Sequence, residues 1–192
     1  MGSLQPIYRA SPTKRARNRR SIYSFQQRSL IDPVIEVFNG PSLDMSCERR
    51  DATTVPTQAF SLFNSELSLD LALAFGARLQ TETSDVTKQI ERAFQLALGR
   101  PPSNEEKELV GQHLSEMTRY YKQNPPPARQ ERPPAELSIT SELTGENVRF
   151  KAAPPPWKYE NNLSANEVSA ETRALADVAL VLFNSNEFAY MH

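Results

Sequence analysis

Apolar residues recur at helical spacing through most of the chain after residue 56, and this pattern predicts a mainly α fold of about five packed helices. The predicted helices begin at Pro56 or Thr57 and near residues 66, 84, 103 and 164. In the third, Ile90, Phe94, Ala97 and Leu98 lie at i, i+4, i+7 and i+8, the pattern of one buried helical face. The apolar positions are Ala59, Phe60, Leu62 and Phe63; Leu69, Leu71, Leu73, Phe75 and Leu79; Ile90, Phe94, Ala97 and Leu98; Val110, Leu114, Met117 and Tyr121; and Val168, Leu175, Val178 and Leu182.

Residues with strong capping preferences mark the helix ends. Gly99 favours a left-handed C-terminal cap, and the prolines at 101 and 102 cannot continue the helix before them. Ser103 with Glu106, and Ser164 with Glu167, have the spacing of a capping box, so each pair predicts a helix start. The fourth helix is expected to end near Tyr121.

The tetrapeptide Leu-Phe-Asn-Ser occurs twice, at 62–65 and 182–185, each time at the end of an apolar run. Asparagine tolerates the left-handed conformation that ends many helices, and serine is a preferred N-cap. We therefore expect Asn64 and Asn184 to end helices and Ser65 to begin the next one. The residues after Asn184 are expected to fold back onto the body of the protein through Phe188 and Tyr190.

The remaining segments predict little regular structure. Residues 21–25 are β-branched and aromatic, which indicates a short strand, and residues 31–42 allow at most one helical turn. Residues 124–162 form a proline-rich insertion, peripheral and mobile, with a small hairpin around 144–147. The predicted organisation is a basic flexible arm over 1–18, followed by one helical domain over 19–192 that contains this insertion.

Charge is distributed unevenly along the 192 residues. The formal net charge is −1, yet the first 30 residues carry seven basic residues and no acidic one. Such an arm could contact nucleic acid, and a nucleic-acid-binding protein driven by it is one alternative function. Because neither an aromatic stacking platform nor a recognition helix accompanies the arm, we favour a solvated leader and expect no nucleic-acid partner.

The chain offers few residues for cofactor chemistry. Cys47 is its one cysteine, and His113 and His192 are its two histidines, so neither an intrachain disulfide nor a metal site is expected. We expect Cys47 to be a small buried residue. The attachment motif of c-type haem is absent. No apolar run reaches the ~20 residues of a membrane-spanning helix, so no membrane span is predicted.

Three separated blocks of sequence resemble one known family. Residues 19–67 contain Arg20-Ser21-Ile22-Tyr23, Ser46-Cys47 and the run Thr54–Ala59. They are similar to the C-terminal half of a domain of unknown function in large exported planctomycete proteins, where it follows a planctomycete-type cytochrome c module. Residues 92–106 and 174–192 also resemble it, whereas residues 1–18 and the insertion do not.

The resemblance implies that the chain is a partial copy of a larger domain in a cell-envelope assembly. The implied partner is the missing upstream domain or another protein chain. The resemblance implies no haem in this chain, and places haem only on a separate module of full-length relatives. The first residues carry no export signal, so a product consisting of this chain alone is expected in the cytoplasm. A partial copy should also expose apolar surface, and we expect it at Ile22, Tyr23 and Phe25.

Polar residues in the best-matched block are the candidate binding residues. Paired guanidinium groups of Arg49 and Arg50 could hold an anionic group, with Gln58 and Asn64 beside them. Alternatively, Gln58 and Asn64 satisfy backbone groups of an ordered loop, which is the commoner use of such side chains. No catalytic motif is present and no catalytic residue is assigned. The function predicted is an accessory or interaction domain, with a fragment of an envelope enzyme acting on polysaccharide as an alternative.

Overall fold

The structure is a computed structural model that describes residues 11–23, 31–41, 47, 56–127, 136–151, 160 and 162–189. The chain divides into two compact units, one formed by residues 1–51 and 130–161 and the other by residues 52–129 and 162–192. We call the second the helical unit. The first unit combines residues 1–51 with residues 130–161 of the proline-rich insertion.

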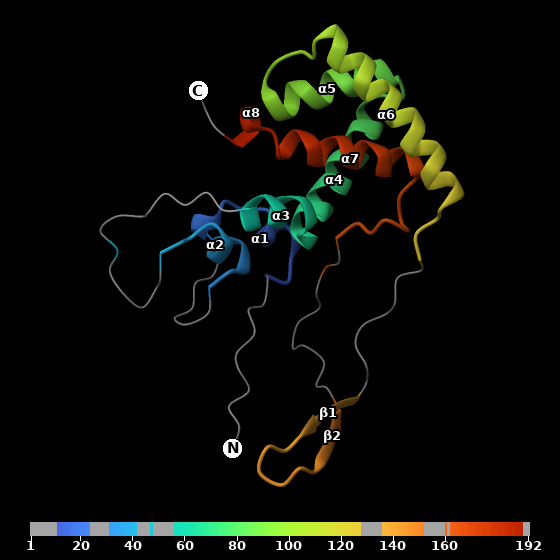
Figure 1. The fold of residues 1–192 in the computed structure, drawn as a ribbon. Helices are drawn as coiled ribbons and strands as arrows, with labels where there is room; N and C mark the ends of the chain where they lie inside the picture. Colours follow the sequence, from blue (N-terminus) through green and yellow to red (C-terminus); the bar gives the residue numbers. More distant parts are fainter. Residues whose placement is uncertain are drawn as a thin grey trace. The chain divides into compact units, whose positions relative to one another are not determined.

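The helical unit is arranged around one central helix (Figure 1). It contains α3 (Pro56–Asn64), α4 (Glu66–Glu82), α5 (Val86–Leu98), α6 (Asn104–Gln123), α7 (Ala170–Phe183) and α8 (Asn186–Ala189). Helix α7 contacts each of the other five. The predicted mainly α fold is confirmed, as are the positions of four of the five predicted helices.

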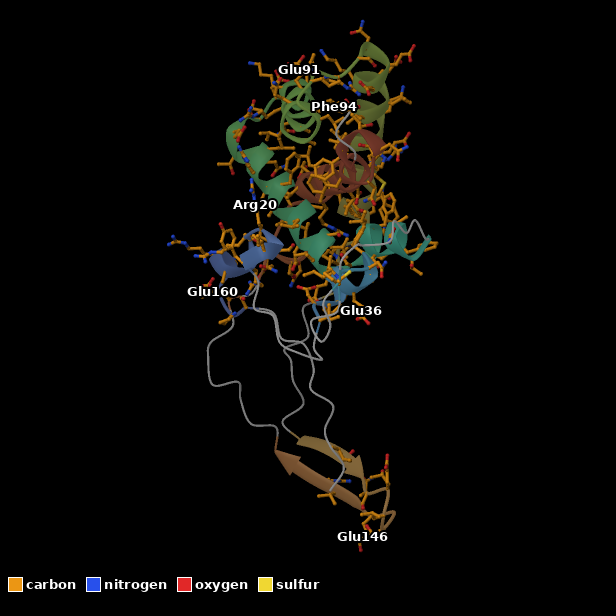
Figure 2. The ribbon with its side chains drawn as sticks, turned by 90° about the vertical axis from the view of Figure 1, so that its left-hand side faces the viewer. Arg20, Glu36, Glu91, Phe94, Glu146 and Glu160 are labelled. Carbon is orange, nitrogen blue, oxygen red and sulfur yellow. The ribbon has the colours of Figure 1, made fainter. Side chains whose placement is uncertain are left out.

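Helix α7 buries seven of its 14 residues, in keeping with its central position. An apolar helix face packs against other elements rather than against solvent. Its buried residues are Thr172, Ala174, Leu175, Ala176, Val178, Ala179 and Leu182. Leu79, Ile90, Phe94 and Leu114 complete the core from the neighbouring helices. Figure 2 shows Phe94 among the helices of this unit. The apolar stripes predicted for α5, α6 and α7 thus face a common core.

The contact between α4 and α7 depends on small residues. Ala72 and Gly76 of α4 are buried, and Ala176 and Ala179 of α7 lie against them. A Cβ atom on Gly76 would lie 2.7 Å from the carbonyl oxygen of Thr172. Of the leucines that the sequence placed on this helix, Leu79 is fully buried, whereas Leu69 and Leu71 are more than 40% exposed. Small side chains let the two backbones approach closely.

The two Leu-Phe-Asn-Ser segments form the same local structure. Asn64 ends α3 and Asn184 is the C-cap of α7, as predicted. The expected left-handed conformation is not present at Asn184, whose φ angle is −97°. Instead, each asparagine Nδ2 donates to the carbonyl oxygen four residues earlier, at 3.1 Å for Phe60 and 2.7 Å for Leu180. At Leu180 this side-chain bond is a second one, because the carbonyl oxygen also accepts from the backbone N–H of Asn184 at 3.1 Å.

The serine that follows each asparagine begins the next helix. Ser65 Oγ accepts a hydrogen bond from Ser68 N at 3.1 Å, and Ser185 Oγ accepts one from Phe188 N at 3.2 Å. This bond satisfies one of the free N–H groups at a helix start. After the second segment, the ring of Phe188 packs on that of Phe183, with centroids 5.2 Å apart. The expected return of the chain is confirmed for Phe188, while Tyr190 lies outside the described residues.

The last long helix begins later than predicted. Its N-cap is Ser169, which accepts a hydrogen bond from Thr172 N, and the helix starts at Ala170 rather than after Ser164. Ser164 and Glu167 do bond to each other, with Ser164 N donating to Glu167 Oε2 at 2.8 Å. They close a separate turn before the helix, because the capping-box pattern specifies a local turn and not its continuation. In contrast, the capping box of Ser103 and Glu106 opens α6 as predicted.

The other unit contains short elements only, among the residues that the structure describes. These are α1 (Lys14–Arg17), a 3-10 turn η1 (Ser21–Tyr23), α2 (Pro33–Val37), and the strands β1 (Glu136–Thr140) and β2 (Asn147–Lys151). The single helical turn and the antiparallel hairpin are confirmed. Glu146 marks the turn end of the hairpin in Figure 2.

The predicted strand over 21–25 is wrong for residues 21–23, which form the 3-10 turn. Tyr23 N donates to Arg20 O at 2.9 Å, so the turn satisfies this backbone group locally, without a partner strand. Ile22 and Tyr23 are 79% and 70% exposed, as expected for an apolar surface, and Phe25 lies outside the described residues.

Part of the predicted basic arm is folded. The guanidinium group of Arg17 donates to the carbonyl oxygens of Ser11 and Pro12, at 2.8 and 3.0 Å, and to that of Glu160. The backbone N–H of Lys14 donates to Glu160 Oε2 at 2.6 Å. Arg17 therefore stabilises a turn, whereas Arg15, Arg19 and Arg20 are exposed.

Arg100 joins the α5–α6 turn to α8. Its guanidinium group pairs with both carboxylate oxygens of Glu106, at 2.8 and 2.9 Å, and with both of Glu187, at 2.6 and 2.9 Å. Planar bidentate pairs of this kind are the stronger form of ion pair. The hydrogen bonds from Arg100, and then those from Ser103, lower the pKa of Glu106 to about 2.

We expect this cluster to lose its contribution to stability in acid. An unfolded glutamate titrates near pH 4.5 and folded Glu106 near pH 2, so the contribution is complete above about 4.5 and disappears as the pH falls to about 2. Urea unfolding of the wild type and of Glu106→Gln, from pH 7 to pH 2, measures it. The variant keeps a side-chain acceptor for the capping box. A stability difference that does not change with pH would contradict the prediction.

Candidate functional site

The four residues that the sequence nominated for binding are only partly described by the structure. Arg49 and Arg50 lie outside the described residues. Gln58 is half-buried on α3, and Asn64 lies six residues further on, at the end of the same helix. The amide group of Asn64 donates to the backbone carbonyl oxygen of Phe60. Asn64 thus serves the helix end, and the binding cleft stays a prediction.

Cys47 is exposed, so the expectation that it is a small buried residue was wrong. It lies between α2 and α3 in the sequence and is not among the core residues of the helical unit. Among the described residues, no three histidine, cysteine, aspartate or glutamate side chains come together as metal ligands. None of the described helices is long and apolar enough to cross a membrane.

A cluster of titratable side chains lies between α6 and α7. Tyr121 Oη donates a hydrogen bond to Asp177 Oδ2 at 2.7 Å, and the guanidinium group of Arg173 lies 3.8 Å from the centre of the Tyr121 ring. His113, two turns before Tyr121 on α6, is half-buried. Within the described part of the chain its Nε2 atom is buried without a hydrogen-bond partner.

Burial dominates the electrostatics of this cluster. It raises the pKa of Tyr121 to about 12, and the hydrogen bond to Asp177 adds to the effect. Burial also raises the pKa of Asp177, against the opposing effects of the Tyr121 hydrogen bond and the charges of His113 and Arg173. A tyrosine held protonated and bonded to a carboxylate is poorly suited to act as a base. The cluster therefore fastens α6 to α7.

Exposed apolar side chains gather on α3 and the first half of α4. We call four of these residues the α3–α4 apolar surface: Phe60, Phe63, Leu67 and Leu71, each between 41% and 64% exposed. Phe60 and Phe63 are one turn apart on α3, and Leu67 and Leu71 are one turn apart on α4. Each helix therefore presents a stripe of apolar side chains to solvent. Single exposed apolar residues are ordinary, but four within twelve residues of chain are not.

The sequence prediction missed this surface because it assigned Phe60 and Phe63 to a buried face. Hydrophobic periodicity identifies the apolar side of a helix but not whether another element covers it. One signal was present in the composition, since α3 contains no charged residue on any side. A helix that is entirely covered or partly bound by a partner has no need of a charged face.

Comparisons with known proteins find a family and no closer relative. No curated protein and no solved structure matches the chain. A family model matches residues 3–114, more than half of the chain, and this match confirms the resemblance to a domain of unknown function. The match includes most of the basic segment that was expected to lie outside the resemblance, and it does not reach residues 174–192. The chain belongs to the family described as Protein of unknown function (DUF1553).

Proposed function

We propose that the helical unit is an interaction domain that docks this chain onto another protein of a larger cell-envelope assembly, one that includes cytochrome c modules. The observation that carries the proposal is the α3–α4 apolar surface. The buried core of a protein–protein interface is enriched in aromatic residues, phenylalanine among them. Phe60 and Phe63 are residues of this kind, and Leu67 and Leu71 add two exposed apolar side chains.

The expected partner is a folded protein with a complementary apolar face. Removing a charged side chain from water costs several kcal/mol. Because α3 contains no charged residue, an apolar partner that covers this helix does not incur that cost. The resemblance of residues 19–67 to part of a larger exported domain supports a partner within the same assembly. It is also the support for the envelope location and for the association with cytochrome c modules.

Site-specific photo-crosslinking in the native cells tests the proposal. We expect p-benzoylphenylalanine at position 60 or 71 to give a discrete product of higher mass, in the envelope fraction, that contains peptides of a second protein. Haem staining of the purified product then tests for a cytochrome c module. The reason for the expected result is proximity, because a bound partner covers these two side chains.

Leu109 provides the matched control position. It is 67% exposed on α6 and is not part of the α3–α4 apolar surface, so a probe there should give no such product. Equal products from positions 60 and 109 would show random collision and would contradict a docking surface. A product containing only peptides of this chain would indicate self-association and would contradict docking onto a second protein. A product found in the soluble fraction would contradict the envelope location. A product that does not stain for haem would contradict the association with a cytochrome c module.

A further inference from the structure

A cavity of about 450 Å³ lies between α4, α5, α6 and α7. Leu114 and Leu175, both buried, and the partly exposed Val86 provide its apolar walls. Gln80, Gln89 and Thr118 are among the polar residues that line it. Sites for small molecules are commonly 300–1,000 Å³, mostly apolar, and equipped with a few polar groups that set the orientation of the ligand. This cavity has the size and the lining of such a site.

Two glutamine side chains of the cavity retain unused hydrogen-bonding groups. Gln89 is only 6% exposed, and its Nε2 donates to the carbonyl oxygen of Thr83 at 2.7 Å. Gln80 Oε1 accepts a hydrogen bond from Thr172 Oγ1 at 2.7 Å. Within the described residues, Gln89 Oε1 and Gln80 Nε2 have no bonding partner. The Gln89 oxygen is not among the fully enclosed unpaired atoms of the described residues, so it remains accessible to a small molecule.

The unused groups are complementary to an amide. The Gln80 N–H group can donate to a ligand carbonyl oxygen, and Gln89 Oε1 can accept from a ligand N–H group. Of the described residues that line the cavity, only Glu171 is charged, and Lys122 Nζ pairs with it at 2.7 Å. An anionic ligand would approach Glu171 and find no cation in this lining, so a neutral ligand is favoured.

We propose that this cavity is a binding site for a small neutral carboxamide with an apolar body. The apolar part lies against Leu114 and Leu175, and the amide group pairs with Gln80 and Gln89. The proposal does not depend on the α3–α4 apolar surface, since none of the residues of that surface lines the cavity.

Cyclohexanecarboxamide is the probe, and cyclohexanecarboxylate, which has nearly the same shape, is the control. In a ¹⁵N NMR titration of the full chain, we expect saturable shifts of the Gln80 and Gln89 side-chain amide signals with the carboxamide. A fragment of this size binds with a Kd of about 1 mM. The carboxylate should cause no saturable shift. Equal binding of both compounds, or shifts elsewhere on the protein, would overturn the proposal.

Gly111 allows the cavity to be filled without disturbing the fold. It lines the cavity, and a Cβ atom built on it has no neighbour within 4 Å. We expect Gly111→Leu to abolish carboxamide binding while the thermal midpoint does not fall, and Gly111→Ala to retain binding. Gln80→Glu keeps the acceptor for Thr172 but loses the donor, and its affinity should fall about fivefold or more. Unchanged affinity in a folded Gly111→Leu or Gln80→Glu protein would refute the assignment.

Discussion

Replacement of Gly76 by alanine is expected to destabilise the helical unit by about 3 kcal/mol and to lower its thermal midpoint by roughly 10 °C. The added methyl group would lie 2.7 Å from Thr172 O and 3.2 Å from Ala176 N. Both are backbone atoms of the central helix α7, so neither can rotate away as a side chain could. Relief requires α4 and α7 to separate along their whole contact, which loosens the core. Thermal unfolding followed by circular dichroism measures the change.

Gly111→Ala is the matched control for this prediction. Gly111 is also in the interior of a helix, but no atom lies within 4 Å of the place that its added methyl group would occupy. The exchange should therefore stabilise the protein by about 0.5–1 kcal/mol, the ordinary gain of alanine over glycine in a helix. The two substitutions are chemically identical, so their difference isolates the close approach of α4 and α7. A neutral or stabilising Gly76→Ala would show that this approach is absent.

Truncation of Phe94 to alanine is expected to cost about 4 kcal/mol, within the usual range for a buried phenylalanine. Phe94 is 3% exposed and belongs to the core cluster with Leu79 and Leu175. Its ring also lies 5.6 Å from the guanidinium carbon of Arg100, so the loss extends to the α5–α6 turn. Urea unfolding at neutral pH is the appropriate measurement, and a midpoint shift with little change in slope indicates a loss of native stability.

Phe60→Ala makes the same chemical change on the α3–α4 apolar surface. Phe60 is 64% exposed, so its truncation should change the free energy of unfolding by less than about 0.5 kcal/mol. The comparison therefore separates a phenylalanine that holds the fold together from one that is available to a partner. A large loss of stability in Phe60→Ala would place that side chain in the core and would remove the basis for the docking surface.

The sequence by itself determined where most helices begin and end, because those signals act over only a few residues. Gly99 adopts a φ angle of 73°, as a left-handed cap requires, and Ser103 with Glu106 closes the capping box. Both Leu-Phe-Asn-Ser segments end one helix and begin another. The apolar stripes of α5, α6 and α7 were also predictable, since three- and four-residue spacing identifies the apolar side of a helix.

Only the tertiary structure decided which apolar faces are covered. The sequence predicted an apolar face on α3 that contains Phe60 and Phe63, yet both are exposed. On α4 the buried residues are Ala72 and Gly76 together with the expected Leu79. Alanine and glycine contribute little to a hydrophobic pattern in the sequence. They contribute to packing only when a second backbone lies close enough to contact them. The same limit applies to the cavity. Gln80, Gln89 and Gly111 come from three helices, and no local pattern connects residues that meet only after the helices have packed.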